Sequence, residues 1–364
     1  MKKVMVAMSG GVDSSVAALL LKKAGFNVVG LTMCLGIKSD DGGKRCCGPE
    51  SISDAKKVCR DLDIKHYVMD FSTELEDKII SKFLGQYLKG QTPNPCVDCN
   101  KFIKFGSLLE KTRALGFDYL ATGHYAKIGK KEGEFLLKKP EDKVKDQTYF
   151  LYPIKKGDLS SILFPLADYT KQKVRKIAKD NHLVVFDKPQ SQDLCFVMEK
   201  KYTKFIRQKN KSLFGGEKPK EGLIVNTAGR ILGKHTGISN YTIGQRKGLG
   251  VSAPEPLYVL SINPEENEII VGEKDKLKQK GLIAGDLNFF TDCLPEKLKA
   301  QIRYRHQAAD CKIEKIDKKL KVIFDDKQEA ITPGQAAVFY DNDTVLGGGT
   351  IESALDENNH KIPN

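Results

Sequence analysis

The chain has 364 residues, of which 40% are hydrophobic and 29% are charged. Its length predicts two or three domains rather than one, and its composition is that of an ordinary globular protein. Lysine and arginine number 60 against 47 acidic residues, so the net charge is +13, which favours a polyanionic partner such as nucleic acid. A lysine-rich surface that is merely solvated would give the same balance.

Two further features bear on the cellular compartment. No apolar run approaches the roughly 20 residues of a membrane span, and the first predicted strand begins too early to leave room for a leader peptide. We therefore expect a cytoplasmic protein with no membrane partner. Its nine cysteines should then be mostly reduced, and clustered ones indicate catalysis or metal binding.

Strands and helices alternate in the first half of the chain. Apolar runs predict strands over Lys3–Met8, Asn27–Met33, His66–Asp70 and Asp118–Gly123. Helical patterns lie over Ser14–Lys23, which reads as amphipathic, and over Ser51–Leu62, Leu75–Leu88 and Phe105–Leu115. This alternation predicts a parallel sheet, and ligands of such sheets bind beyond the carboxyl ends of the strands.

The turn after the first predicted strand, Ser9–Ser15, reads Ser-Gly-Gly-Val-Asp-Ser-Ser. Two glycines let the backbone approach a ligand, and the hydroxyls of Ser9, Ser14 and Ser15 can face an anion together with the first helix amides. The pattern lacks the lysine of the common mononucleotide-binding loop. Asp13 instead suits the pyrophosphate part of ATP with Mg²⁺. The loop resembles that of the ATP-pyrophosphatase superfamily, whose members cleave ATP between its α- and β-phosphates.

A cysteine pair follows two prolines in the segment Thr92–Phe105, with Cys96 and Cys99 three positions apart at the entrance of a helix. The prolines make the approach rigid, and the helix dipole favours thiolates there. The spacing alone fits a redox pair, half of a zinc site or part of an iron–sulfur site. A second pair at zinc-ribbon spacing is missing from the sequence, so a zinc finger is a minor alternative. A further thiol, Cys195, lies in the segment Ser191–Phe196.

Short β-rich segments separated by glycine and proline make up the second half. They are Gly222–Val225, Leu257–Leu260, Glu268–Val271, Leu298–Tyr304, Lys312–Ile316, Leu320–Phe324, Ala336–Tyr340 and Thr344–Leu346. Several short strands with turn signals between them predict a small antiparallel barrel.

Seven segments, in their order and spacing, resemble those of the bacterial tRNA-specific 2-thiouridylase family throughout the chain. They are Ser9–Ser15, Thr92–Phe105, Ala121–Tyr125, Lys145–Leu151, Gly244–Gly250, Arg303–Arg305 and Thr332–Ala336. The resemblance implies an α/β fold that begins with an adenine-nucleotide α-hydrolase-like parallel sheet with helices, the ATP-pyrophosphatase catalytic domain (1–199). A small central α/β domain that contacts tRNA (200–278) and a C-terminal antiparallel β-barrel that binds tRNA (279–364) should follow.

The resemblance also implies an enzyme, a tRNA-uridine 2-sulfurtransferase that uses ATP and Mg²⁺. ATP adenylates O2 of the wobble uridine, and sulfur from a cysteine persulfide then displaces AMP, since a persulfide is a strong nucleophile. By position, Cys195 carries the persulfide, Cys99 is the nucleophile that frees the sulfur as sulfide or by forming a disulfide, and Asp13 belongs to the catalytic set. The implied partners are a tRNA with a wobble uridine and a persulfide donor protein charged by a cysteine desulfurase.

The same correspondence implies the binding residues. ATP and Mg²⁺ are assigned to Ala7, Met8, Ser9, Gly10, Gly11, Val12, Asp13, Ser14, Ser15, Met33 and Gly123. Contacts with tRNA are assigned to Asn94, Pro95, Cys96, His124, Lys145, Asp146, Gln147, Arg303, Tyr304 and Gln335. Ordinary roles compete at two positions, because Met33 is also a plausible core residue and His124 a capping residue. The pair Arg303-Tyr304 suits a phosphate and a stacked base.

At Cys96 the chain departs from one common form of the family, which has an aspartate there. Cys96, Cys99 and Cys195 could together hold a [4Fe–4S] cluster, so persulfide chemistry and cluster-bound sulfur transfer both stay open. Two rival functions also stay open. One is an amide- or amidine-forming ligase of the same superfamily, which needs no cysteine set, and the second is a noncatalytic tRNA-binding iron–sulfur protein. We expect the cysteines at positions 34, 46, 47 and 59 to be incidental thiols.

Overall fold

The computed structural model describes residues 1–38, 44–45, 49–189, 194–197, 203, 205–206, 209, 220–358 and 360–362. The chain divides into two compact units. The first comprises Met1–Ile79, Cys96–Phe196 and Asp343–Val345, and the second comprises Ile80–Pro95, Val197–Asn342 and Leu346–Asn364. None of the helices in the described part of the chain is long and apolar enough to cross a membrane.

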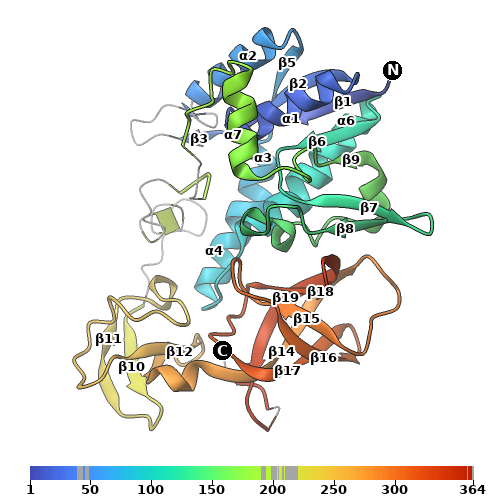
Figure 1. Cartoon of the computed structure of the whole chain (residues 1–364). Coiled ribbons are helices and arrows are strands. Elements are labelled where there is room, and N and C mark those ends of the chain that lie inside the picture. Colours follow the sequence, from blue (N-terminus) through green and yellow to red (C-terminus); the bar gives the residue numbers. More distant parts are fainter. Residues whose placement is uncertain are drawn as a thin grey trace. The chain divides into compact units, whose positions relative to one another are not determined.

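A five-stranded parallel sheet forms the centre of the first unit (Figure 1). Its strands lie in the order β5 (Lys65–Asp70), β2 (Asn27–Cys34), β1 (Lys3–Ala7), β6 (Tyr119–Thr122) and β9 (Ile162–Leu163). The four strands predicted from apolar runs are confirmed to within one residue at each end. Because β1 is central in this sheet, its apolar side chains are covered on both faces.

Helices and short turns surround this sheet. They are α1 (Val12–Lys23), α2 (Pro49–Asp61), α3 (Ser72–Leu75), the π-helix η1 (Glu76–Ile80), α5 (Pro95–Asp98), the π-helix η2 (Cys99–Leu108), α6 (Leu109–Ala114), α7 (Lys171–Asp180) and the 3₁₀ turns η3 (Lys143–Lys145), η4 (Thr148–Phe150) and η5 (Lys156–Ser161). Two hairpins are formed by β3 (Ile37–Lys38) with β4 (Lys44–Arg45) and by β7 (Lys127–Lys131) with β8 (Glu134–Lys138).

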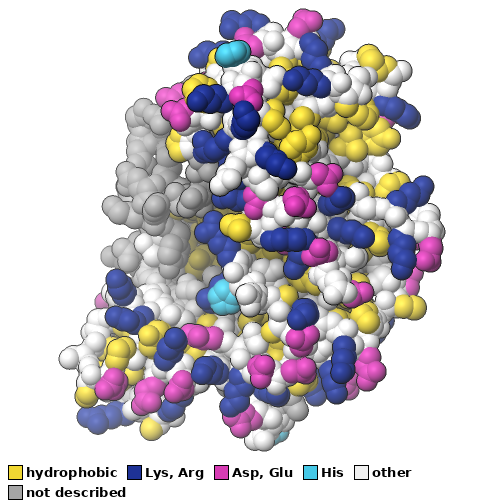
Figure 2. Space-filling model, in the orientation of Figure 1, with side chains coloured by type: hydrophobic (Ala, Val, Ile, Leu, Met, Phe, Trp, Pro, Cys, Tyr) yellow, Lys and Arg dark blue, Asp and Glu magenta, His cyan; other side chains and the backbone are white. Residues whose placement is uncertain are grey.

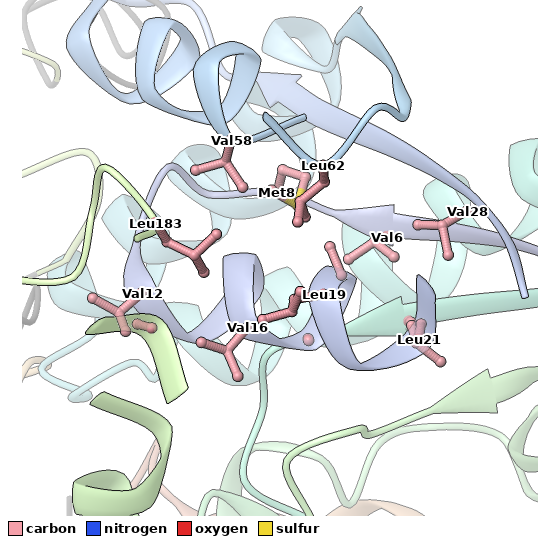
Figure 3. Close-up of a cluster of buried hydrophobic side chains, with 14 of the residues drawn as sticks. Val6, Met8, Val12, Val16, Leu19, Leu21, Val28, Val58, Leu62 and Leu183 are labelled. Atoms are coloured by element: carbon pink, nitrogen blue, oxygen red, sulfur yellow. The ribbon is translucent and has the colours of Figure 1, made fainter. Parts of the chain in front are cut away.

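Apolar side chains from β1, α1 and α2 form the core of the first unit. Figure 3 shows Met8, which directly follows β1, with Val16 and Leu19 of α1 and Val58 of α2 in one cluster. The prediction that α1 is amphipathic is wrong, because most of its residues are buried. The cause is α7, which also packs against α1, and a helix that is covered on several sides needs few polar positions.

The predicted helix over 105–115 in fact begins ten residues earlier. Helical structure starts at Pro95 and continues through η2 and α6, with a kink at Gly106, where the backbone is not helical. Proline is favoured at a first helical position, because the N–H that it lacks has no helical partner there. Cys96 and Cys99 therefore lie in the first turns of this helical segment, which agrees with their prediction at the entrance of a helix.

The second unit contains a four-stranded sheet from the middle of the chain. Its order is β11 (Ile231–His235), β10 (Gly222–Asn226), β13 (Glu268–Gly272) and β12 (Tyr258–Asn263). The remaining regular structure within residues 220–277 is two 3₁₀ turns, η6 (Ile238–Asn240) and η7 (Lys274–Leu277). Residues 203, 205, 206 and 209, which also belong to the predicted central domain, are helical.

A closed six-stranded antiparallel barrel forms the rest of the second unit, together with helix α4 (Ser81–Leu88). Its strands are β14 (Lys278–Phe289), β17 (Lys319–Glu329), β16 (Ala309–Ile316), β15 (Leu298–Gln301), β18 (Ala336–Asp341) and β19 (Thr344–Leu355), and β14 pairs with β19 to close it. The predicted barrel is confirmed. Strand β14 was missed and β19 extends nine residues beyond its predicted end, because glycines interrupt the apolar pattern of both strands.

The excess positive charge is distributed broadly over the visible surface. Figure 2 shows Lys and Arg side chains spread across that face and interleaved with Asp and Glu. Charge distribution on this face therefore does not by itself mark a nucleic-acid site.

Candidate functional site

The predicted phosphate loop follows β1 at the carboxyl end of the parallel sheet. Gly10 has φ +69°, and a Cβ there would lie 2.2 Å from the carbonyl oxygen of Ser51 in α2. Only glycine lets the loop turn against α2 in this way. Helix α1 begins at Val12, and no side chain caps it at Gly11, so its first N–H groups are available to an anion.

The three loop serines differ in exposure and in role. Ser9 is exposed, whereas Ser14 and Ser15 are buried. The Ser14 hydroxyl accepts a hydrogen bond from the backbone N–H of Ser9 at 3.1 Å, and the Ser15 hydroxyl donates to the Gly11 carbonyl at 2.8 Å. The two buried hydroxyls thus brace the turn, and the hydroxyl of Ser9 is the one that solvent reaches.

The residues after β6 pack directly on this loop. A Cβ at Gly123 would lie 2.7 Å from the backbone nitrogen of Ser14, so glycine permits a close backbone approach. Two positions later, the hydroxyl of buried Tyr125 donates to the Asp13 carboxylate at 2.8 Å. Burial and the neighbouring Asp13 raise the pKa of Tyr125 far above its ordinary value, which keeps it protonated as a donor.

His124, which lies between these two residues, contacts a different helix. Its Nε2 lies 3.5 Å from Nζ of Lys104 in η2, and its Nδ1 lies 2.7 Å from the Thr122 hydroxyl. Burial and the Lys104 ammonium lower the pKa of His124 well below its usual value, so the imidazole is neutral at pH 7. Because an ammonium can only donate, Nε2 accepts and Nδ1 carries the proton. Residues 123–125 therefore connect the phosphate loop with the cysteine-bearing helix.

Asp13 forms an ion pair that sequence analysis missed. Nζ of Lys171 lies 2.6 and 2.7 Å from its two carboxylate oxygens. Lys171 is the first residue of α7, where the helix dipole disfavours a cation, and that local conflict is the signal that could have marked it. Lys188 also reaches the loop, with Nζ 3.2 Å from the Gly10 carbonyl and 2.7 Å from Asp54. A loop without its own lysine thus receives two from distant segments.

The cysteine pair lies at the junction of α5 and η2. Hydrogen bonds of a π-helix join residues five apart, which places Cys99 and Lys104 on one face of η2. The side-chain amide of Asn100 donates to the Phe150 carbonyl at 2.9 Å and ties η2 to η4. Burial raises the pKa of the Cys96 and Cys99 thiols, and Lys104 opposes this rise by favouring the thiolates. The Cys96 side chain nevertheless reaches solvent.

Cys195 is exposed and, like Cys96 and Cys99, is not part of a disulfide. In the part of the chain that is described, no three His, Cys, Asp or Glu side chains are placed to hold a metal ion together. A [4Fe–4S] cluster on Cys96, Cys99 and Cys195 stays a prediction. Residues 191–193 of the Cys195 segment, and the cysteines at 46 and 47, lie outside the described residues. Cys34 is disulfide-bonded, which corrects its prediction as an incidental thiol.

The oxygen donors of the phosphate loop do fit Mg²⁺. This ion takes one or two carboxylates together with phosphate oxygens of a nucleotide, and Asp13 and the exposed Ser9 hydroxyl supply ligands of that kind. The other residues assigned to ATP flank this point: Ala7 ends β1, Met8 and Val12 are buried, and Met33 is half-buried near the end of β2. Their contact with ATP stays a prediction.

Two of the residues assigned to tRNA bond within the first unit. Asp146 accepts hydrogen bonds from the backbone N–H and hydroxyl of Thr148 at 2.9 and 2.7 Å, and burial raises the pKa of its carboxyl. The side-chain carbonyl of Gln147 accepts a hydrogen bond from the backbone N–H of Tyr125 at 2.9 Å, and the backbone N–H of Gln147 donates to the Tyr125 carbonyl at 3.0 Å. Lys145 ends η3 next to them. These bonds order the segment beside the phosphate loop.

In the second unit, Gln335 holds the stretch that precedes the cysteine helix. Its side-chain amide donates to the carbonyls of Thr92 and Pro93 at 2.9 and 3.2 Å. The Thr92 N–H donates to the Pro333 carbonyl at 2.9 Å. Two motifs about 240 residues apart in sequence therefore form one clamp just before residues 94–95.

The predicted basic and aromatic pair lies between β15 and β16. The Arg305 guanidinium lies 5.4 Å from the centroid of the Tyr304 ring, and Arg305 has φ +67°. Burial and the nearby Arg303 lower the pKa of His306. The turn thus presents cationic and aromatic groups together, and their contact with tRNA stays a prediction.

Three family models match the chain in succession. They are described as a tRNA methyl transferase HUP domain over residues 2–199, a tRNA methyl transferase PRC-barrel domain over 214–273 and an aminomethyltransferase beta-barrel domain over 279–351. The first matches more than half of the chain and spans the phosphate loop, the cysteine pair and Cys195.

Curated relatives match nearly the whole chain. A tRNA-specific 2-thiouridylase MnmA 1 of Syntrophus aciditrophicus is 51% identical over 97% of this chain and 94% of its own length, and a tRNA-specific 2-thiouridylase MnmA of Carboxydothermus hydrogenoformans is 48% identical over 97% and 98%. Among solved structures, a 4-thiouridine synthetase–RNA complex with bound ATP is 14% identical with a TM-score of 0.36, over 57% of this chain and 50% of that chain. By the identity and coverage of the curated relatives, the chain belongs to the tRNA-specific 2-thiouridylase family.

Proposed function

We propose that the chain catalyses ATP-dependent 2-thiolation of the wobble uridine of tRNA in the cytoplasm. The single observation that carries this proposal is the link made by residues 123–125. Gly123 and Tyr125 contact the phosphate loop, and His124 between them contacts Lys104 of the cysteine helix. An ATP-activating loop and a thiol-bearing helix that share one support suit activation of a base followed by sulfur attack.

The first step is adenylation. Uracil O2 attacks the α-phosphorus of ATP, the bond to the β-phosphate oxygen breaks, and pyrophosphate leaves with the electron pair. The open N–H groups of α1 and the Ser9 hydroxyl are the groups of this chain that would hold the phosphates, and Mg²⁺ held by Asp13 would offset the negative charge of the phosphates. Pyrophosphate is a good leaving group, and AMP becomes one in turn.

The second step is sulfur transfer. The outer sulfur of a persulfide on Cys195 attacks C2 of the uracil, and the bond from C2 to the AMP oxygen breaks. Cys99 as thiolate then attacks the inner sulfur, so the sulfur–sulfur bond breaks, a Cys99–Cys195 disulfide forms, and the electron pair stays on the 2-thio group. An external thiol must reduce this disulfide before the next turnover. Lys104 supports the step because it favours the Cys99 thiolate.

The test is anaerobic incubation of the chain with tRNA transcript, ATP, Mg²⁺ and a cysteine desulfurase with cysteine, followed by nucleoside mass spectrometry. We expect 2-thiouridine, together with AMP and pyrophosphate. Cys99→Ser and Cys195→Ser should abolish the thionucleoside, while Cys293→Ser, an exposed cysteine of the second unit, should leave it unchanged. Absence of 2-thiouridine from the unmodified chain would overturn the proposal.

The same preparation separates thiolation by persulfide from a ligase activity and from cluster-bound sulfur transfer. Full ATP turnover in both serine variants would favour a ligase, because such an enzyme does not need the thiols. Stoichiometric iron that is lost together in the Cys96, Cys99 and Cys195 serine variants would favour cluster-bound sulfur. We expect neither result.

A further inference from the structure

We propose that Lys171 binds the two outer phosphates of ATP, and that Asp13 and Asp142 hold it in position for that role. The inference rests on the proposed use of ATP and adds a residue to it. The phosphate loop itself carries no lysine, although the leaving pyrophosphate is its most highly charged ligand. The Lys171 ammonium supplies the missing cation at Asp13, in the middle of the loop.

Both ends of Lys171 are fixed by carboxylates. Its backbone N–H donates to Asp142 at 2.8 Å, and its Nζ bonds both oxygens of Asp13. The same Asp142 side chain accepts the N–H groups of Val144 and Lys145, so the anchor is itself held by η3. Tyr125 in turn fixes Asp13 by donating to it. A cation ordered in this way loses little conformational entropy when it binds a phosphate.

Stability alone does not account for the pair. Its side chains are 13% and 23% exposed for Lys171 and Asp13, and pairs so far removed from water gain little net stability because of desolvation. A lysine at the first position of α7 also opposes the helix dipole. An unfavourable placement of this kind is expected for a side chain whose role is to bind a ligand.

Lys188 has a different role at the same loop. Its ammonium is shared between the Gly10 carbonyl and Asp54, so it joins the loop to α2. The Lys171 ammonium, in contrast, contacts only the loop carboxylate in the hydrogen bonds described for it. We therefore assign the outer phosphates to Lys171 and the bracing of the loop to Lys188.

The test compares binding of ATP and AMP by isothermal titration calorimetry with Mg²⁺ and without tRNA. Lys171→Ala should weaken ATP binding by about tenfold to a hundredfold, the loss typical of a charge-assisted hydrogen bond, and should leave AMP binding within about twofold. Inhibition of turnover by added pyrophosphate should weaken by the same factor. Lys171→Arg should keep most of the preference for ATP over AMP, because arginine keeps the positive charge.

The matched control is Lys173→Ala, an exposed lysine on the same helix, which should bind both nucleotides as the unmodified chain does. Circular dichroism of each variant verifies that it is folded. An equal loss of ATP and AMP affinity in Lys171→Ala, or no loss, would overturn the proposal and assign Lys171 a structural role. An unmodified chain that binds ATP no more tightly than AMP would also overturn it.

These outcomes are independent of the thiolation assay. If no 2-thiouridine forms but Lys171→Ala still loses the preference for ATP, the proposed function fails and the role of Lys171 stands. If thiolation proceeds and Lys171→Ala binds ATP normally, the proposed function stands and the role of Lys171 fails.

Discussion

Replacing Gly123 by alanine tests whether close backbone contact holds the phosphate loop in shape. The added Cβ would lie 2.7 Å from the nitrogen of Ser14 and 2.8 Å from the carbonyl carbon of Asp13. These atoms belong to the backbone of α1, so no side chain can rotate away to relieve the overlap. Overpacking of this kind costs about 1–3 kcal/mol, and here the strain falls on the turn that would bind ATP.

The assay is urea unfolding followed by far-UV circular dichroism, because the chain contains no tryptophan, together with calorimetry of ATP binding. With a slope of about 2 kcal/mol per M, a loss of ~2 kcal/mol lowers the unfolding midpoint by about 1 M. ATP and AMP affinity should fall together, since the whole loop shifts. Gly157→Ala is the control, because no atom lies within 4 Å of a Cβ there. A Gly123→Ala protein with unchanged midpoint and ATP affinity would refute the reasoning.

Three further predictions concern other parts of the molecule. Gln335→Ala removes two hydrogen bonds to backbone carbonyls, which should cost about 1–3 kcal/mol of local stability and make hydrogen exchange at the Thr92 amide faster. Unchanged exchange would contradict the clamp. Lys104→Met removes the cation that favours the Cys99 thiolate, so the thiol pKa should rise and alkylation by iodoacetamide at pH 8 should slow, and equal or faster alkylation would argue against it. Burial raises the pKa of Cys59 to about 12, so mass spectrometry should find this thiol unlabelled in the native protein and labelled in urea.

Four of the five strands of the parallel sheet were predicted almost to the residue because their cause is local. A buried parallel strand must be apolar throughout, and the glycine-rich turn after β1 marks where it ends. Helix starts were predicted less well. The helix at Pro95 was placed ten residues too late, because its first turns carry cysteine, asparagine and lysine instead of an apolar stripe.

Some residues of the candidate site could be predicted from the sequence and others could not. The loop Ser9–Ser15 and the pair Cys96 and Cys99 stand out in sequence, because their spacing alone implies chemistry. The hydrogen bonds that Gln147 and Gln335 make within the protein cannot be seen in the sequence. The Gln147 side chain bonds to a backbone group 22 residues away, and the Gln335 side chain to one 243 residues away. No local pattern distinguishes an amide that orders a loop from one that awaits a ligand.

The sequence by itself determined the parallel strands, the glycine-rich turn after β1 and a terminal barrel, since short-range patterns encode each of these, and it predicted ATP and sulfur chemistry at the loop and at three cysteines. Only the tertiary structure decided which groups meet at the loop. Lys171 reaches Asp13 across 158 residues of sequence. That contact follows from the packing of α7 on α1 and from a sheet order that brings the ends of β1 and β6 together, and the sequence around Lys171 and Asp13 does not encode which distant segments pack together.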